Sequence, residues 1–329
     1  MRSLITVGVS DTPTGRAALR WALGHAARND ATVLLLHVVP VDAGPSAIVA
    51  AGQLLTRAVD EASTIAPVVP VSFLVLRGGV AEELISATAA AGMLVVGGRR
   101  GSEGEPGGSP ISWAIAAGAA CPVVVVPDSD RLFAHGVVLG LDDSASGRAA
   151  AAFAGSQAAS SRQRLTLVRA WESDGLPQDE SREAAAREGA ARRAADELLS
   201  AMRDHLGRQH PEVAIDVRSI RGPAADVLGE SSAHALLLVL GTALGVTSGE
   251  AVVGAAGTAA LRRMRAPIAF VHTAHVPALT EDRGWEDAVS EGWSDSLAGA
   301  RRSPVLTPSR SRASAAARAS LRRGRAAAS

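Results

Sequence analysis

The chain has 329 residues, enough for two ordinary domains, and 47% of them are hydrophobic. All 33 basic residues are arginine, which excludes chemistry that needs a lysine amine, such as a Schiff base or a phosphate-loop lysine. The formal net charge at pH 7 is zero, so the overall charge indicates neither a nucleic acid nor a membrane surface as a partner.

Cys121 is the only cysteine, so no disulfide can form within the chain, and we interpret it as a small core residue. No histidine stands at ligand spacing from it, so we predict no metal site of the chain's own. No apolar run reaches membrane-spanning length, and the short apolar stretch near the N-terminus is unlike a signal peptide. These features predict a cytoplasmic protein without a membrane partner.

In the first part of the chain, short aliphatic runs bounded by glycine, proline or aspartate alternate with amphipathic segments. The aliphatic runs are hydrophobic on both faces, which is typical of parallel strands covered by helices. Thr14 is expected to cap the first helix, and His37 is interpreted as a polar group at a strand end. The buried face of that helix is expected to comprise Ala18, Leu19, Ala22 and Ala26.

The order of elements occurs twice. The stretch "SLITVGVSDTPTGRAA", which begins at Ser3, is matched by "GVVLGLDDSASGRAA", which begins at Gly136, so that Gly8 corresponds to Gly140 at an offset of 132 residues. From "LRGGVAEELI" and "IRGPAADVLG" onward the offset is 144 or 145. A single slip of this kind predicts an insertion in the second copy.

The inserted residues fall in "SREAAAREGAARRAADELLSAMRDHLG", which is expected to form a long helix that ends at Gly207. The helix that opens the second copy is expected to be capped by Ser146. Its inward residues are expected to be Ala150, Phe153 and Ala154.

Alternating strands and helices predict right-handed crossovers and an open parallel sheet in each copy, with any ligand at the carboxyl ends of the strands. The last strand of each copy, near Val123–Val126 and Ile268–Val271, is aliphatic and uncharged, and such a strand invites pairing where it forms a sheet edge. Since both copies are in one chain, we expect these edges to pair as an intramolecular pseudo-dimer. Further association into a homodimer stays open.

Residues 274–329 have neither a strand pattern nor a long apolar stripe. They are acidic at first and then rich in arginine, and we expect a disordered tail. The alternative is a basic arm that contacts nucleic acid, which is otherwise not an expected partner.

The blocks "ITVGVSDTPTGRAALRWAL", "LLLHVV", "RGGVAEELI", "LVVGGRRG" and "CPVVVV" resemble, in this order, a universal stress protein domain, and the second copy resembles it again. The whole is similar to tandem universal stress proteins of the actinobacterial type. This resemblance implies an α/β fold of two repeated, doubly wound, open five-stranded parallel-sheet sandwiches, like the adenine nucleotide alpha hydrolases, with domains at 1–128 and 134–273. It also implies ATP binding through a G-x-x-G-x9-G-S/T loop and an aspartate at the end of the first strand.

The first copy departs from this pattern. Glycines at both ends of Gly98–Gly101 fit, but Gly108-Ser109 follows after six residues instead of nine, and Ser10 stands where the aspartate is expected. Glycine matters because a backbone that approaches phosphates closely tolerates no side chain, and a Gly-Ser at a helix start presents amides to an anion. The predicted site residues are Ser10, Asp11, Val38, Gly97, Gly98, Arg99, Gly101, Gly108 and Ser109.

The second copy keeps the loop length, with nine residues between Leu244 and Gly254, but Leu244 replaces a glycine and Ala255 replaces the hydroxyl residue. It also keeps Asp142, which either recognises adenine or only supports the cap of the following helix. The predicted site residues are Asp142, Ala170, Gly241, Gly254 and Ala255.

The resemblance implies a stress-response regulator, not an enzyme, that binds ATP weakly and signals through an unidentified protein partner. The only metal expected is Mg²⁺ that accompanies the nucleotide. Two alternatives are a nucleotide-free protein-interaction scaffold and a slow ATP hydrolase on the same fold.

Overall fold

The computed structural model describes residues 2–99, 110–128, 134–172, 182–242, 245–247, 250–252, 257, 260–261 and 265–273. The predicted tail, 274–329, lies outside the described residues, and its disorder stays a prediction. The described residues fall into two compact units, and the boundary between these units along the chain lies between Val95 and Val96.

The first unit is an α/β layer. Its elements are β1 (Leu4–Gly8), α1 (Pro13–Asn29), β2 (Thr32–Val39), α2 (Pro45–Ile65), β3 (Val71–Arg77), α3 (Val80–Ala87), the 3-10 turn η1 (Thr88–Ala90) and β4 (Met93–Gly97), whose last two residues belong to the second unit. The strand order is β3-β2-β1-β4, and β1, β2 and β3 are parallel. Helices α1 and α2 contact each other over these strands.

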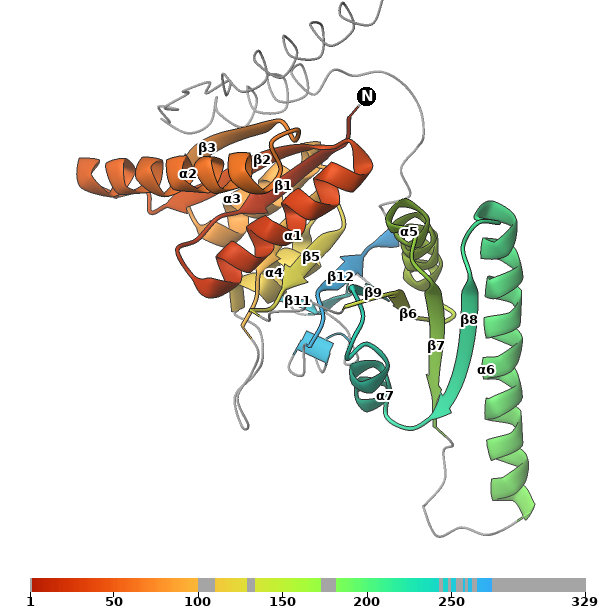
Figure 1. The fold of residues 1–329 in the computed structure, drawn as a ribbon. Helices are drawn as coiled ribbons and strands as arrows, with labels where there is room; N and C mark the ends of the chain where they lie inside the picture. The colour runs from red at the N-terminus through yellow and green to blue at the C-terminus, as the bar shows by residue number, and fades with distance from the viewer. Residues whose placement is uncertain are drawn as a thin grey trace, which may run out of the picture. The chain divides into compact units, whose positions relative to one another are not determined.

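The second unit contains the rest of the described elements. They are α4 (Pro110–Gly118), β5 (Val123–Val126), β6 (Val137–Gly140), α5 (Ala145–Ser161), β7 (Leu165–Trp171), α6 (Arg182–Gln209), β8 (Ile215–Arg221), α7 (Ala224–Ser231), β9 (Leu237–Gly241), β10 (Gly245–Thr247), β11 (Glu250–Val252) and β12 (Ile268–Val271). The strand order is β5-β12-β9-β6-β7-β8. Helix α7 lies on the other side of β7 and β8 from α6 (Figure 1).

The predicted α/β fold with repeated parallel sheets is confirmed. The second copy contributes five parallel strands in the order β12-β9-β6-β7-β8. The first copy contributes β1 to β5, and β5 lies beside the end of β4, where the Gly98 amide donates to the Val126 carbonyl oxygen at 2.9 Å. In both copies aliphatic residues that are hydrophobic on both faces form the buried strands, as parallel strands require.

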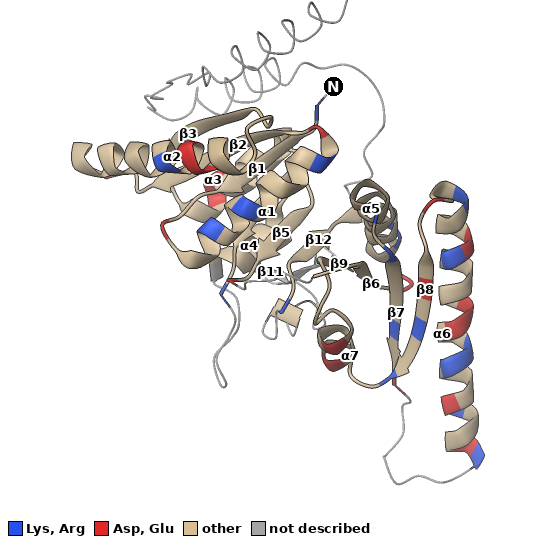
Figure 2. Cartoon of the chain, viewed as in Figure 1, with Lys and Arg blue, Asp and Glu red and all other residues tan. Residues whose placement is uncertain are grey.

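The expected pairing of the two last strands is also confirmed. Strands β5 and β12 are antiparallel neighbours, with Val124 opposite Ala269. Every side chain in these strands is at most 4% exposed, and none is charged (Figure 2). The compact units therefore do not follow the copies, because β5 of the first copy belongs to the unit that contains all described strands of the second.

The helix caps differ from the expectation. Thr12 and Ser144, and not Thr14 and Ser146, accept the first amide bonds of α1 and α5. Helix α1 starts earlier because Pro13 has no N–H and its fixed φ suits the first helical position. Ser146 in turn is buried inside the first turn of α5.

The inward residues of α1 are confirmed, since all four are at most 2% exposed. In α5 the expectation holds for Ala150 and Ala154 but not for Phe153, which is half-buried beside a face of small residues. The long helix α6 does not end at Gly207 but continues to Gln209. The reason is that Leu206, which is fully buried, anchors its last turn.

Helix α6 carries both signs of charge along its length (Figure 2). None of the described helices is both long enough and apolar enough to cross a membrane.

Candidate functional site

Strands β1 and β6 are each followed by a turn, and the two turns have the same hydrogen-bond pattern. The next residues, Val9 and Leu141, donate their amides to the carbonyl oxygens of Leu36 at 2.7 Å and Val168 at 2.9 Å. A hydroxyl then caps the following helix, because it accepts the amide of Gly15 at 3.0 Å or of Gly147 at 2.8 Å. The two copies thus build one geometry from different residues.

The glycine in each "GRAA" sequence is required by a close approach. A Cβ on Gly15 would overlap the backbone oxygen of Ser10, and a Cβ on Gly147 would lie 2.5 Å from the backbone oxygen of Asp142. In each copy the first helical turn therefore rests directly on the second residue after the strand. This contact explains why the sequence repeats at these positions.

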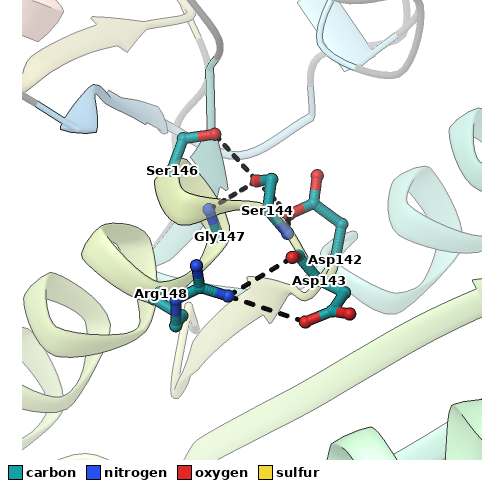
Figure 3. Close-up of polar contacts among 6 residues, drawn as sticks. All are labelled: Asp142, Asp143, Ser144, Ser146, Gly147 and Arg148. Atoms are coloured by element: carbon teal, nitrogen blue, oxygen red, sulfur yellow. Dashed lines mark hydrogen bonds and ion pairs between the residues drawn. The ribbon is translucent and has the colours of Figure 1, made fainter.

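Asp142 is held in place by the cap of α5 (Figure 3). Its Oδ1 accepts from the amide of Ser144 at 3.1 Å and from the hydroxyl of the same residue at 2.5 Å. The Ser144 hydroxyl also accepts the Gly147 amide, so Asp142 orients the cap without being the cap. Asp142 is exposed, and its Oδ2, which points away from Ser144 in Figure 3, has no hydrogen-bond partner within the described ranges.

The aspartate at the next position forms an ion pair in both copies, which is a different role from that of Asp142. Asp143 pairs with Arg148, 3.6 Å between Oδ1 and Nη1, and Asp11 pairs with Arg16 at 3.1 Å. Asp11 is therefore the counterpart of Asp143, and no carboxylate in the first copy occupies the place of Asp142. Ser10 is there instead, with its hydroxyl 2.9 Å from that of Thr12.

His37 was expected at a strand end, but it lies within β2, two residues before the strand ends at Val39, and is half-buried. Its Nδ1 lies 2.8 Å from the carbonyl oxygen of Val9, to which it donates. Arg169, its counterpart in β7, donates to the carbonyl oxygen of Leu141 at 3.1 Å. Val38 and Ala170, the predicted site residues directly after His37 and Arg169, differ in exposure. Val38 is buried and Ala170 is half-buried.

Gly241 and Asp142 are brought together by the fold. Gly241 ends β9, the neighbour of β6, and a Cβ on it would lie 2.5 Å from the carbonyl carbon of Ser146 and 2.6 Å from the Gly147 nitrogen. It therefore lies against the same helical turn that rests on Asp142. In the first copy Gly97 ends β4, Gly98 bonds to Val126, and Arg99 is the last described residue before the loop.

The loop after β9 contains a hairpin that the sequence reasoning missed. Strands β10 and β11 pair antiparallel within the stretch taken as a phosphate loop, and α4 lies against β11. The available signal was Ser248-Gly249 between β-prone residues, which is typical of a two-residue hairpin turn. The predicted site residues outside the described ranges are Gly101, Gly108, Ser109, Gly254 and Ala255.

Comparison with known proteins relates these repeats to a protein family. The sequence model of the universal stress protein family matches residues 1–127. The first copy is a universal stress protein domain. Two universal stress proteins of Mycobacterium tuberculosis, from strains CDC 1551 and H37Rv, are each 26% identical over 286 residues, which is 80% of this chain and 94% of theirs. That match extends far beyond the first copy, so the similarity to these two proteins includes the second copy as well.

Solved structures agree on the fold. A universal stress protein from Archaeoglobus fulgidus has a TM-score of 0.62 at 14% identity and covers 82% of this chain and 96% of its own. A protein of unknown function from Pseudomonas aeruginosa has a TM-score of 0.58 at 18% identity, with coverage of 88% and 97%. At these identities the likeness shows the universal stress protein fold and no more.

Potential metal ligands are not grouped in the part of the chain that the structure describes. Among those residues no three His, Cys, Asp or Glu side chains come together as a metal site would require.

Gly241→Ala is expected to lower the free energy of unfolding by about 2 kcal/mol, because the methyl group would overlap the first turn of α5. Urea unfolding followed by circular dichroism measures this change. Gly207→Ala is the control: nothing lies within 4 Å of its Cβ position, so alanine in the helix should stabilise by about 0.5–1 kcal/mol. Equal effects of the two substitutions would contradict the close packing at Gly241.

Proposed function

We propose that this universal stress protein binds ATP weakly in its second copy, at the carboxyl ends of β6, β7 and β9, and acts as a stress-response regulator in the cytoplasm. The observation that carries the proposal is the hydrogen bonding of the Asp142 carboxylate. One carboxylate oxygen is fixed by Ser144, and the other faces outward from an ordered turn.

Adenine recognition follows from the chemistry of that oxygen. The exocyclic amino group of adenine is a hydrogen-bond donor, and a carboxylate oxygen accepts such a bond strongly. Since Oδ1 is already engaged, Asp142 can accept with Oδ2 without releasing the cap of α5. Gly241 lets the backbone at the end of β9 approach the same place.

Phosphate binding is assigned to the loop after the hairpin. The family resemblance gives this role to Gly254 and Ala255, and Ala255 offers an amide but no hydroxyl. We infer weak binding for this reason, with Mg²⁺ held mainly by the phosphates. The first copy has Ser10 in place of the carboxylate, so we propose no adenine site of comparable strength there.

Signalling through a protein partner, without enzymatic turnover, completes the proposal. The second candidate is a nucleotide-free scaffold. It is favoured by one observation: the hairpin β10–β11 lies within the predicted phosphate loop and against α4, so this loop has a structural role as well.

Calorimetry with Mg-ATP tests the proposal. Asp142→Asn keeps one oxygen for Ser144 but loses the outward acceptor, and it is expected to weaken ATP binding about tenfold. Asp143→Asn is the matched control, since Asp143 is exposed and paired with Arg148, and should change affinity less than twofold. Absence of heat and of a thermal shift at millimolar ATP in the unmodified protein would favour the scaffold. Phosphate release above that of the Asp142→Asn variant would favour a hydrolase.

A further inference from the structure

A buried histidine connects elements of the two copies. His272, the residue after β12, is 2% exposed, and its Nε2 lies 2.6 Å from the carbonyl oxygen of Ala116 in α4. Its Nδ1 lies 2.8 Å from the hydroxyl of Thr242, the residue after β9, which is 3% exposed. The imidazole thus spans from a helix of the first copy to a strand end of the second.

The hydrogen bonds of this ring have a fixed direction. A carbonyl oxygen only accepts, so Nε2 carries the proton that is donated to Ala116. In the neutral ring Nδ1 then accepts from the Thr242 hydroxyl at 2.8 Å. This contact is shorter than the 3.4 Å from that hydroxyl to the Val271 carbonyl oxygen and the 3.3 Å from Nδ1 to the Thr242 carbonyl oxygen. Thr242 is itself held, since its amide donates to the carbonyl oxygen of Val271 at 2.9 Å.

Both ends of this connection lie beside the candidate phosphate loops. Helix α4 begins directly after the loop of the first copy, and Thr242 follows Gly241, the first glycine of the loop pattern in the second. A second contact joins the same parts, because α4 lies against β11, within the second loop. In the first copy Pro127 occupies the position equivalent to His272, so the sequence provides no second histidine bond of this kind.

We propose that His272 couples the loop region of the second copy to helix α4 of the first, so that a change at the end of β9 alters the local stability of α4. Loss of the Thr242 hydroxyl would leave Nδ1 without its donor and free the ring to turn, which weakens its bond to Ala116. For the functional consequence, the proposal rests on the proposed ATP site: a ligand that orders the end of β9 would also order α4, with equal coupling in both directions.

Hydrogen exchange of the full chain without nucleotide tests the coupling. Thr242→Val removes the hydroxyl at nearly constant volume, and amides of α4 are expected to exchange about tenfold faster relative to amides of α7. Thr242→Ser keeps the hydroxyl and should restore the α4 rate to within about twofold of the unmodified protein. An unchanged α4 rate in Thr242→Val, or equally fast exchange in Thr242→Ser, would overturn the proposal.

Ser232→Ala separates coupling from general destabilisation. Ser232 is 3% exposed and donates to the carbonyl oxygen of Leu228 at 2.7 Å, so its loss also removes a buried hydroxyl from the second copy. It has no bond to His272, and it should leave α4 exchange unchanged relative to β7. Selective acceleration of α4 in this variant would also contradict a specific role of His272.

Addition of Mg-ATP then measures the functional consequence. It should slow α4 exchange in the unmodified protein and in Thr242→Ser, and have less effect in Thr242→Val. If calorimetry detects no ATP binding, the proposed function fails, while the nucleotide-free exchange rates still decide whether the coupling exists.

Discussion

Val124→Asp is expected to lower the free energy of unfolding by about 3–5 kcal/mol, because it places an unpaired charge in the interior. Val124 is fully buried in β5 and lies opposite Ala269 of β12. No charged side chain in either strand can pair with the new carboxylate. Urea unfolding measures the loss, and hydrogen exchange at Ile268–Phe270 reports whether the partner strand is released.

Val217→Asp is the matched control for this substitution. Val217 also lies in a strand, but β8 is at the end of the strand order and the side chain is 39% exposed. Water can solvate a carboxylate there, so the expected loss is below about 1 kcal/mol. Similar losses at the two positions, or unchanged protection of β12 in Val124→Asp, would contradict the pairing of β5 with β12.

Acidification from pH 6.5 to 4 is expected to remove about 3 kcal/mol of stability through one residue, His25. Burial and, to a smaller extent, the charge of Arg28 together lower the pKa of His25 to about 4. The ring stacks on Trp21 with centroids 5.2 Å apart, and Asn29 Nδ2 lies 3.3 Å from Nε2. Asn29 can only donate at that atom, so a proton on Nε2 would oppose it.

The sign of this effect follows from proton binding. Between pH 6.5 and 4 the unfolded chain binds a proton at His25 that the folded chain excludes, so stability is complete above pH 6.5 and falls toward pH 4. His25→Phe keeps a stacked ring and should remove this part of the pH dependence. His205→Gln, at an exposed position of α6, should not. A wild-type minus His25→Phe difference that is constant with pH would refute the assignment.

The fold could be predicted because the repeat constrains it twice. Each aliphatic run recurs with its flanking glycine, so both copies indicate the same order of parallel strands. The pairing of β5 with β12 followed from edge strands that have no charge to protect them. The helix caps were harder to predict from the sequence. Thr12 and Thr14 are both hydroxyl residues, and only the geometry of Pro13 decides between them.

The site was predicted in part. The close approach of Gly241 to α5 and the place of Asp142 at a strand end are local consequences of the repeat. The hairpin β10–β11 was missed because a spacing rule for glycines says nothing about pairing within the loop. The role of His272 depends on Ala116, which is 156 residues away along the chain, and no local pattern indicates such a contact.

Native mass spectrometry of the full chain at saturating Mg-ATP tests the central claim most directly. The asymmetry between Asp142 and Ser10 predicts one bound nucleotide per chain. Two nucleotides per chain, or none, would contradict a single adenine site in the second copy.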